Sequence, residues 1–184
     1  KIGFKNIFSY RGYESDDIMA EIARSSRCDE EVILVTADSD MFQCLSSNVM
    51  IYSPQKKKLL TDAWFKKEYG IHSSDWWKVK AIAGCSSDEV EGVRGVGELT
   101  AVKYLRRELD KDGKAYQTIV SAESKAIIAR NRALVKLPYG GCPTPDLVED
   151  EVDCEGWREV CKILGMRSIV SHPPIATRKR GQHE

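Results

Sequence analysis

The chain has 184 residues, 42% of them hydrophobic, and a formal net charge of zero. This composition predicts one domain, or a core with a smaller appended part, and excludes a wholly disordered chain. No apolar run is long enough to cross a bilayer, and six cysteines without a C-x-x-C pair predict reduced thiols in a cytosolic protein rather than a disulfide framework.

The first half of the chain predicts strands that alternate with helices, which is typical of an α/β core. Val32 to Val35 is a continuous apolar run that favours a strand buried on both faces, and therefore a parallel sheet. Around this run we expect strands at 6–10 and 49–52 and helices at 14–24, 39–45 and 63–69, followed by a helix that begins after Ser73 or Ser74 and runs through Ala83. Thr61 or Asp62, and then Ser73 or Ser74, are the candidate caps of the last two helices. The residues 56–58 read as a solvated turn, and the tryptophans 64, 76 and 77 as core.

From residue 84 the character of the sequence changes. Glycines 84, 92, 95 and 97 fall close together, and helix-prone sequence follows. We expect helices at 98–109, 114–120, 122–136 and 155–164, and a frayed tail at 178–184. The sequence therefore predicts an α/β core over residues 1–83 and a helical region over residues 84–184.

The charges are unevenly distributed. Residues 1–50 carry five Lys/Arg against nine Asp/Glu, whereas residues 97–137 carry nine against five. An acidic half that holds metal beside a basic half that holds phosphate would show this asymmetry, although solvated faces would show it as well.

Acidic residues form three short clusters at the ends of expected elements. Carboxylates gathered in this way repel one another unless cations neutralise them, so the clusters predict a divalent-metal site suited to phosphodiester hydrolysis. Asp17 and Asp38 have a structural alternative, because either could cap a helix. The candidate ligands and catalytic residues are Glu14, Asp16 and Asp17, then Asp38 and Asp40, and finally Asp88.

A glycine-rich turn precedes the helix expected at 98–109. Such a turn can press main-chain amides against a phosphate without reading base sequence. On its own the pattern is weak evidence, because many tight helix–helix turns look alike. The candidate nucleic-acid contacts are Gly92, Val93, Arg94, Gly95, Val96, Gly97, Thr100, Lys103, Arg106 and Arg107.

Together, these motifs resemble the 5′-nuclease superfamily of flap endonucleases and bacterial or phage 5′–3′ exonucleases. The matching segments are GYESDD at 12–17, TADSDMFQ at 36–43 and GCSSDEVEGVRGVGELTA at 84–101. The resemblance implies a PIN-like α/β nuclease core with a parallel sheet, followed by a helix-three-turn-helix. It implies two Mg²⁺ or Mn²⁺ ions, one on the side of the first cluster and one on the side of the second cluster and Asp88. It further implies that the hairpin holds duplex DNA, often with K⁺ on main-chain carbonyls.

The sequence departs from the family pattern in three ways. The first strand, its metal-binding aspartate and the helical arch of the family are absent, so we expect the chain to be the C-terminal part of a nuclease, with the N-terminal part as a partner. Cys85 stands where microbial members usually have aspartate, and cysteine is a poor Mg²⁺ ligand. Leu99 replaces a usual lysine, which removes one phosphate contact.

The expected activity is divalent-metal-dependent hydrolysis of DNA at or near a 5′ end or flap, in replication or repair. Two alternatives stay open, namely a non-catalytic protein that binds DNA structure and a PIN-type ribonuclease. The expected location is the cytoplasm, with a phage gene as one possible source; the motifs name no sliding-clamp or polymerase partner and predict no membrane partner.

Overall fold

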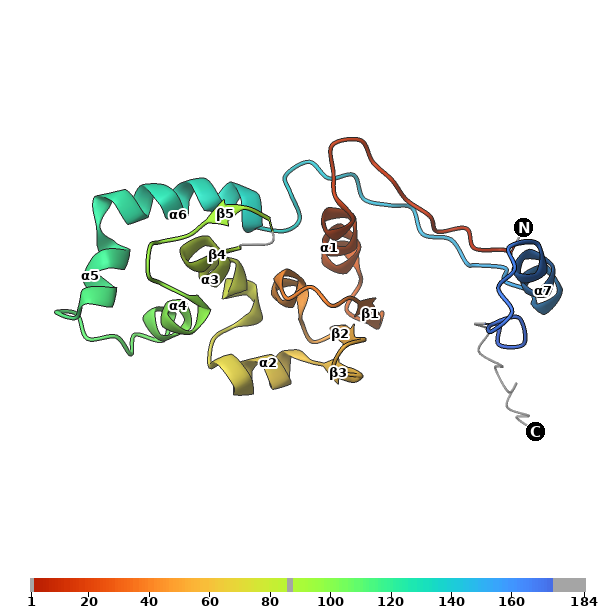
Figure 1. Ribbon diagram of the computed structural model, residues 1–184, viewed down its shortest axis with the longest axis horizontal. Coiled ribbons are helices and arrows are strands. Elements are labelled where there is room, and N and C mark those ends of the chain that lie inside the picture. The colour runs from red at the N-terminus through yellow and green to blue at the C-terminus, as the bar shows by residue number, and fades with distance from the viewer. Residues whose placement is uncertain (1, 86–87, 174–184) are drawn as a thin grey trace. The chain divides into compact units, whose positions relative to one another are not determined.

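A computed structural model describes residues 2–85 and 88–173 (Figure 1). Contacts divide the chain into two compact units. One is Tyr10–Pro145, and the other combines Lys1–Ser9 with Asp146–Glu184. Within the described residues, no helix is both long enough and apolar enough to cross a membrane.

The larger unit begins with an α/β arrangement and continues with helices. Its elements are α1 (Ser15–Ser25), β1 (Val32–Val35), the 3-10 helix η1 (Asp40–Cys44), β2 (Val49–Ser53), β3 (Lys58–Leu60), α2 (Asp62–Tyr69), the 3-10 helix η2 (Ser73–Asp75), α3 (Trp76–Ala83), β4 (Gly84–Cys85), β5 (Val90–Glu91), α4 (Glu98–Leu105), α5 (Lys114–Val120) and α6 (Ala122–Val135). The smaller unit contains α7 (Cys154–Ile163).

The main sheet has the order β1-β2-β3. β1 and β2 are parallel, as predicted, whereas the short β3 was missed because its lysine-rich start reads as a turn. The expectation that β1 is buried on both faces is wrong. Leu34 is buried, but Ile33 and Val35, which point to the opposite face, are 48% and 61% exposed, so only one face of the strand is covered.

The helix caps follow the sequence in one case and not in the other. Thr61 caps α2 by accepting a hydrogen bond from the Trp64 amide, and Gly70 ends that helix with φ 67°. Neither serine caps α3, which starts after Asp75. The Ser73 hydroxyl instead donates to the Leu45 carbonyl and lies 2.6 Å from the Asp62 carboxylate.

The strand expected at 6–10 is wrong. This segment runs beside residues 148–151, but side chains make much of the pairing. Asn6 donates to the Val148 carbonyl, and the Lys5 amide donates to the Asp150 carboxylate. Side-chain bonds of this kind replace the regular main-chain ladder that defines a strand.

The helices after residue 84 occur close to their expected positions. α4 is shorter than predicted, because it ends at Leu105 and Arg107 adopts a positive φ of 60°. The boundary expected near residue 84 falls inside the larger unit, where α3 packs against α4 and α6. A division of function at that point stays a prediction, and the tail expected at 178–184 lies outside the described residues.

Aromatic side chains form the core beneath the acidic clusters. Trp76 and Phe65 are fully buried, and both pack against Phe42 of η1 and Tyr69 of α2. Trp76 is core as expected, but Trp77 is only half-buried, with three cationic side chains near its ring. This packing fixes α3 against η1 and so positions the side chains of the site.

Candidate functional site

Five of the six predicted carboxylates line one hollow of about 410 Å³. They come from the start of α1, from the loop after β1 with η1, and from the β4–β5 hairpin. Glu89, Val90, Leu134, Val135 and Leu137 complete the lining. The hollow therefore brings together all three clusters that the sequence singled out; its members are Glu14, Asp16, Asp38, Asp40 and Asp88.

Asp16 and Asp38 lie close enough to interact. Burial raises the pKa of Asp16 above its ordinary value, and the negative charge of Asp38 raises it further. A carboxylate that is destabilised in this way by a like charge is what a bound cation would relieve. Carboxylate oxygens are also the donors that Mg²⁺ and Mn²⁺ prefer, so this side of the hollow fits such an ion.

We expect Asp16 to give the metal-free protein a measurable pH dependence. Its pKa is raised in the folded state, so the folded protein binds more protons than the unfolded chain between the ordinary value of 3.8 and the raised value. The destabilisation is fully present above the folded pKa and disappears as pH falls below the unfolded pKa. The free energy of unfolding of the parent should therefore rise relative to Asp16→Asn on acidification.

Urea unfolding between about pH 7 and about pH 4, with chelator present, measures this difference. Asp112→Asn, at an exposed loop aspartate, is the control and should show no such trend. Added divalent cation should raise the stability of the parent at neutral pH more than that of Asp16→Asn. A difference between parent and Asp16→Asn that does not change with pH would contradict the prediction.

Asp40 is held by a lysine that the sequence analysis missed. Lys80 of α3 is only 4% exposed, and its Nζ lies 2.8 Å from Asp40 Oδ1 and 2.7 Å from Glu98 Oε1. Lys80 also donates to the Ser39 hydroxyl. Burial raises the pKa of Asp40, and the ammonium of Lys80 opposes this rise without cancelling it. For Lys80 itself burial would lower the pKa, but Asp40 and Glu98 outweigh burial and raise it.

Lys80 thereby connects the acidic hollow to the helix after the hairpin, because Glu98 is the first residue of α4. The one signal in the sequence is a lysine at position i+4 from Trp76, next to Val79 and Ala81 on the helix. A lysine among core positions requires a buried partner, which local sequence does not identify.

Asp17 is the one predicted ligand outside the lining of the hollow. It is 7% exposed, and its two carboxylate oxygens accept hydrogen bonds from the main-chain amides of Glu14 and Tyr139. These contacts are those of a capping residue that also ties α1 to the chain after α6. A direct role of Asp17 as a metal ligand stays a prediction, which these contacts do not favour.

Asp38 combines a structural contact with its place in the hollow. Its Oδ1 accepts a hydrogen bond of 2.8 Å from the amide of Asp40, the first residue of η1. The carboxylate also interacts with Asp16 and Asp40. Asp38 therefore lies between the two sides of the site, because its charge acts on both.

Two amides hold the elements of the site in place. Gln43 of η1 donates to the Val135 carbonyl and accepts from the Leu137 amide, which fixes η1 to the end of α6. Asn131 is fully buried and donates to the main-chain carbonyls of Ala81 and Glu91, which fixes the hairpin to α3 and α6. Sequence analysis assigned neither residue a role, because both act across 40 or more positions.

The glycine-rich turn at 92–97 contains both buried and exposed residues. Val93 and Val96 are buried, and their amides donate to the carbonyls of Ile82 and Val93. Neither amide is therefore available to a phosphate, although both valines were candidate contacts. A Cβ on Gly92 would lie 2.1 Å from the Ala83 carbonyl oxygen, so only glycine fits there.

Gly95 and Gly97 face open space, where a Cβ would meet nothing within 4 Å. Gly95 has φ 76°, which favours glycine, and Gly97 is the N-cap of α4, whose first amides have no partner within the helix. The exposed part of the hairpin is thus Arg94 to Gly95 together with Gly97. This is the part that can approach a phosphate.

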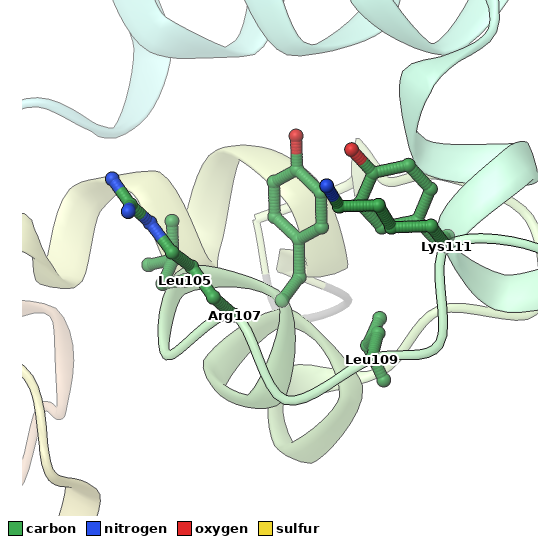
Figure 2. A pocket seen from close by; sticks show the side chains of 6 residues that line it. Leu105, Arg107, Leu109 and Lys111 are labelled. Carbon is green, nitrogen blue, oxygen red and sulfur yellow. The ribbon is translucent and has the colours of Figure 1, made fainter.

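The predicted cations after the hairpin are not equivalent. Arg106 lies 2.6 Å from Glu108, whereas within the described residues no ion pair involves Arg107 or Lys103. Arg107 and Lys111 carry their charged ends to the same side of the turn between α4 and α5 (Figure 2). They line a hollow of about 420 Å³ with Tyr104, Leu105, Leu109 and Tyr116.

Comparison with known proteins agrees with this geometry. A model of the 5′–3′ exonuclease N-terminal resolvase-like domain matches residues 2–70. DNA polymerase I of Thermus thermophilus is 40% identical over 96 residues, which is 52% of this chain and 11% of the polymerase. The 5′–3′ exonuclease of Bacillus subtilis is 34% identical over 110 residues, which is 58% of this chain and 37% of the exonuclease.

Among solved structures, a mutant of the T5 5′-exonuclease has a TM-score of 0.61 with 24% identity. The match covers 71% of this chain and 58% of that one. The resemblance to the 5′-nuclease superfamily is confirmed. The α/β fold of a 5′-nuclease core is confirmed with it.

The chain spans less than half the length of the curated relatives it matches. Another T5 structure is described as having divalent zinc ions bound, and a further one as a complex of the flap endonuclease with DNA and metal ions. Among the described residues, the clustered side chains of Asp40, Cys85 and Asp88 could hold a divalent metal ion.

Proposed function

We propose that this 5′-nuclease core takes part in divalent-metal-dependent hydrolysis of DNA phosphodiesters at or near a 5′ end or flap. The observation that carries the proposal is the convergence of five carboxylates from three separate segments on one hollow. The similarity to 5′–3′ exonucleases supports it. Replication or repair is the process in which such hydrolysis would serve, and a cytoplasmic location is part of the same proposal.

The position of each carboxylate assigns it to one of two proposed metal ions. Glu14, Asp16 and Asp38 offer oxygens to one ion, for which Mg²⁺ or Mn²⁺ is the proposed species, and Asp40 and Asp88 face a second ion. Divalent ions at such a site activate water and offset the charge that builds up on the phosphoryl and leaving oxygens. Lys80 orients Asp40 through their ion pair. Gln43 holds η1 against the end of α6, and Asn131 holds α6 against α3.

Duplex DNA is proposed to contact the exposed part of the hairpin and the cations beyond it. Amides at a helix start bind phosphate without regard to base sequence, and K⁺ on the hairpin carbonyls belongs to the same proposal. Arg107 and Lys111 extend this surface, because both are exposed and lie on the same side of one turn.

Arg107→Ala should weaken duplex binding to a similar degree for all sequences and reduce the slope of log affinity against log salt by about 1. The reason is that Arg107 has no ion pair among the described residues and can neutralise one phosphate. Fluorescence anisotropy over a salt series measures both quantities. Arg106→Ala is the matched control, since its guanidinium already pairs with Glu108. Equal effects of the two substitutions would contradict this assignment.

The proposed function is tested by cleavage of a flap duplex labelled at its 5′ end, with Mg²⁺ or Mn²⁺ and with chelator. The chain is assayed alone and joined to the N-terminal segment of a 5′–3′ exonuclease relative. Cleavage near the 5′ end that requires the metal supports the proposal. Duplex binding without cleavage in both samples overturns it in favour of a non-catalytic protein that binds DNA structure, which Cys85 would help to explain. Cleavage of RNA alone would instead indicate a PIN-type ribonuclease.

A further inference from the structure

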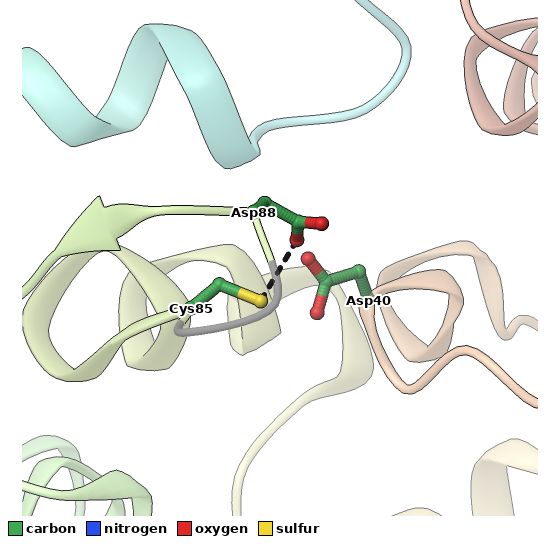
Figure 3. A group of neighbouring side chains, drawn as sticks. All are labelled: Asp40, Cys85 and Asp88. Atoms are coloured by element: carbon green, nitrogen blue, oxygen red, sulfur yellow. Dashed lines mark hydrogen bonds between the residues drawn. The ribbon is translucent and has the colours of Figure 1, made fainter.

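Cys85 lies close in space to Asp40 and Asp88, two carboxylates that line the acidic hollow. One potential ligand atom from each of Asp40, Cys85 and Asp88 lies within 4.8 Å of the other two. The Cys85 thiol donates a hydrogen bond of 2.8 Å to Asp88 Oδ2. Figure 3 shows the hairpin presenting Cys85 and Asp88 toward Asp40. A single cation could therefore contact sulfur and two carboxylates at once.

This donor set does not fit Mg²⁺ well. Mg²⁺ requires near-octahedral oxygen coordination and has little affinity for thiolate sulfur. Zn²⁺ accepts sulfur and carboxylate oxygen together in a four-coordinate site, and three protein ligands leave one position for water or substrate. The substitution of sulfur for oxygen at one position thus changes which ion the second side of the hollow selects.

The charge around the group matches a divalent cation. A thiolate and two carboxylates carry three negative charges, and the buried ammonium of Lys80 next to Asp40 supplies one positive charge. Asp40 Oδ1 is buried and accepts no hydrogen bond in addition to this ion pair. Lys80 also pairs with Glu98, so at least about two negative charges remain for one divalent ion to offset. In the metal-free group Cys85 is a thiol, and the repulsion is that between Asp40 and Asp88.

Hydrogen bonds anchor the elements that carry the three ligands to the rest of the unit. Asn131 fixes the hairpin that carries Cys85 and Asp88, and Gln43 fixes the 3-10 helix that begins with Asp40. A site whose supporting elements are already bonded to the core needs little rearrangement to accept an ion.

We propose that Asp40, Cys85 and Asp88 form a thiolate–carboxylate site that selects Zn²⁺ over Mg²⁺. The inference rests on the proposed function only in placing the site beside the other carboxylates, and its chemistry is independent of hydrolysis. Binding converts the Cys85 thiol to a thiolate, with its proton released to solvent. The nuclease core would then hold two unlike ions, a hard one near Asp16 and a softer one near Cys85.

The test uses Cd²⁺ as a spectroscopic probe, because its bond to a thiolate gives an ultraviolet charge-transfer band that needs no enzymatic activity. The parent should show this band with one Cd²⁺ per chain, and Zn²⁺ should displace it while excess Mg²⁺ should not. Loss of even an outer-shell partner costs about 10–100-fold in metal affinity, so Cys85→Ser should weaken zinc binding by at least about 100-fold and remove the band.

Cys28→Ser is the matched control, since Cys28 is an exposed thiol in the turn after α1. It should leave the band and the zinc affinity unchanged. Cys85→Asp should also lack the band but bind Mn²⁺ more tightly than the parent. Circular dichroism confirms that each variant is folded, and Cys85→Asp keeps the test decisive if Cys85→Ser is unstable.

A band that survives in Cys85→Ser, or that Mg²⁺ displaces as readily as Zn²⁺, would overturn the proposal. The result is separable from the proposed function. A cysteine-dependent band without DNA cleavage would support the zinc site and overturn the proposed nuclease function. Cleavage with Mg²⁺ but without the band would support the nuclease function and overturn the zinc site.

Discussion

Asp38→Asn and Asp88→Asn should each lower the rate of DNA hydrolysis by at least about 10³-fold while leaving duplex affinity nearly unchanged. This factor corresponds to about 4 kcal/mol, which is within the several kcal/mol that metal ions contribute to transition-state charge stabilisation. Both carboxylates line the hollow, and neither belongs to the glycine-rich turn at 92–97 that is proposed to contact the duplex. Asparagine keeps the shape of the side chain and removes the charge that holds a cation.

Asp40 is the wrong residue for this experiment, although its carboxylate belongs to the same group. Its replacement would leave the buried ammonium of Lys80 with less compensation, so a loss of activity would be mixed with a loss of stability. Asp38 and Asp88 are exposed and have no such partner among the described ion pairs.

Single-turnover cleavage of a flap duplex measures the rate, and anisotropy in the presence of chelator measures binding. Asp29→Asn is the control for the same chemical exchange, because Asp29 is exposed in the turn before β1 and pairs with Arg27. It should change neither quantity. Full activity of Asp38→Asn would show that the hollow is not the metal site, whereas a parallel loss of binding would show that the two functions are not separate.

Lys80→Met should lower the free energy of unfolding by about 3–5 kcal/mol, which is the usual cost of removing one partner of a buried ion pair. Methionine preserves much of the length and the apolar stem of the side chain. The cost arises because Asp40, already destabilised by burial, loses the ammonium that lies 2.8 Å away. Glu98 is affected less, since its side chain is 47% exposed and reaches water.

Urea unfolding in the absence of divalent cations measures this loss. Lys78→Met is the matched control on the same helix, because Lys78 pairs with Asp75 at the surface and such pairs contribute only about 0–1 kcal/mol. The double variant Lys80→Met/Asp40→Asn should recover much of the loss, since no unpaired charge is left buried. Equal effects of the two lysine substitutions would mean that the buried position of Lys80 has no energetic consequence.

Local sequence was sufficient for most of the architecture. The apolar run from Val32 to Val35 predicted a strand and its parallel pairing, and Thr61 with Gly70 predicted both ends of α2. Each of these signals acts over a few residues, through side-chain period, capping or a positive φ. The same short-range chemistry placed the acidic clusters at the ends of elements.

The expectations that failed depended on neighbours distant in sequence. The burial predicted for β1 requires cover on both faces, and the strand predicted at 6–10 requires a partner that pairs through its main chain. Neither requirement can be read from the residues of the segment itself, because an apolar run looks the same at an edge and in the centre of a sheet.

The sequence by itself identified the five carboxylates that line the hollow, together with Asp17, which does not, because the order and spacing of the three motifs resemble the 5′-nuclease pattern. Only the tertiary structure decided what each one contacts. In the fold, Asp17 accepts hydrogen bonds from two main-chain amides, and Asp40 forms an ion pair with a lysine 40 positions away in the sequence. Asp88 accepts a hydrogen bond from the Cys85 thiol. The physical reason is that the properties of a carboxylate depend on burial and on charges within a few ångströms, and folding brings these from helices and turns that no local pattern connects.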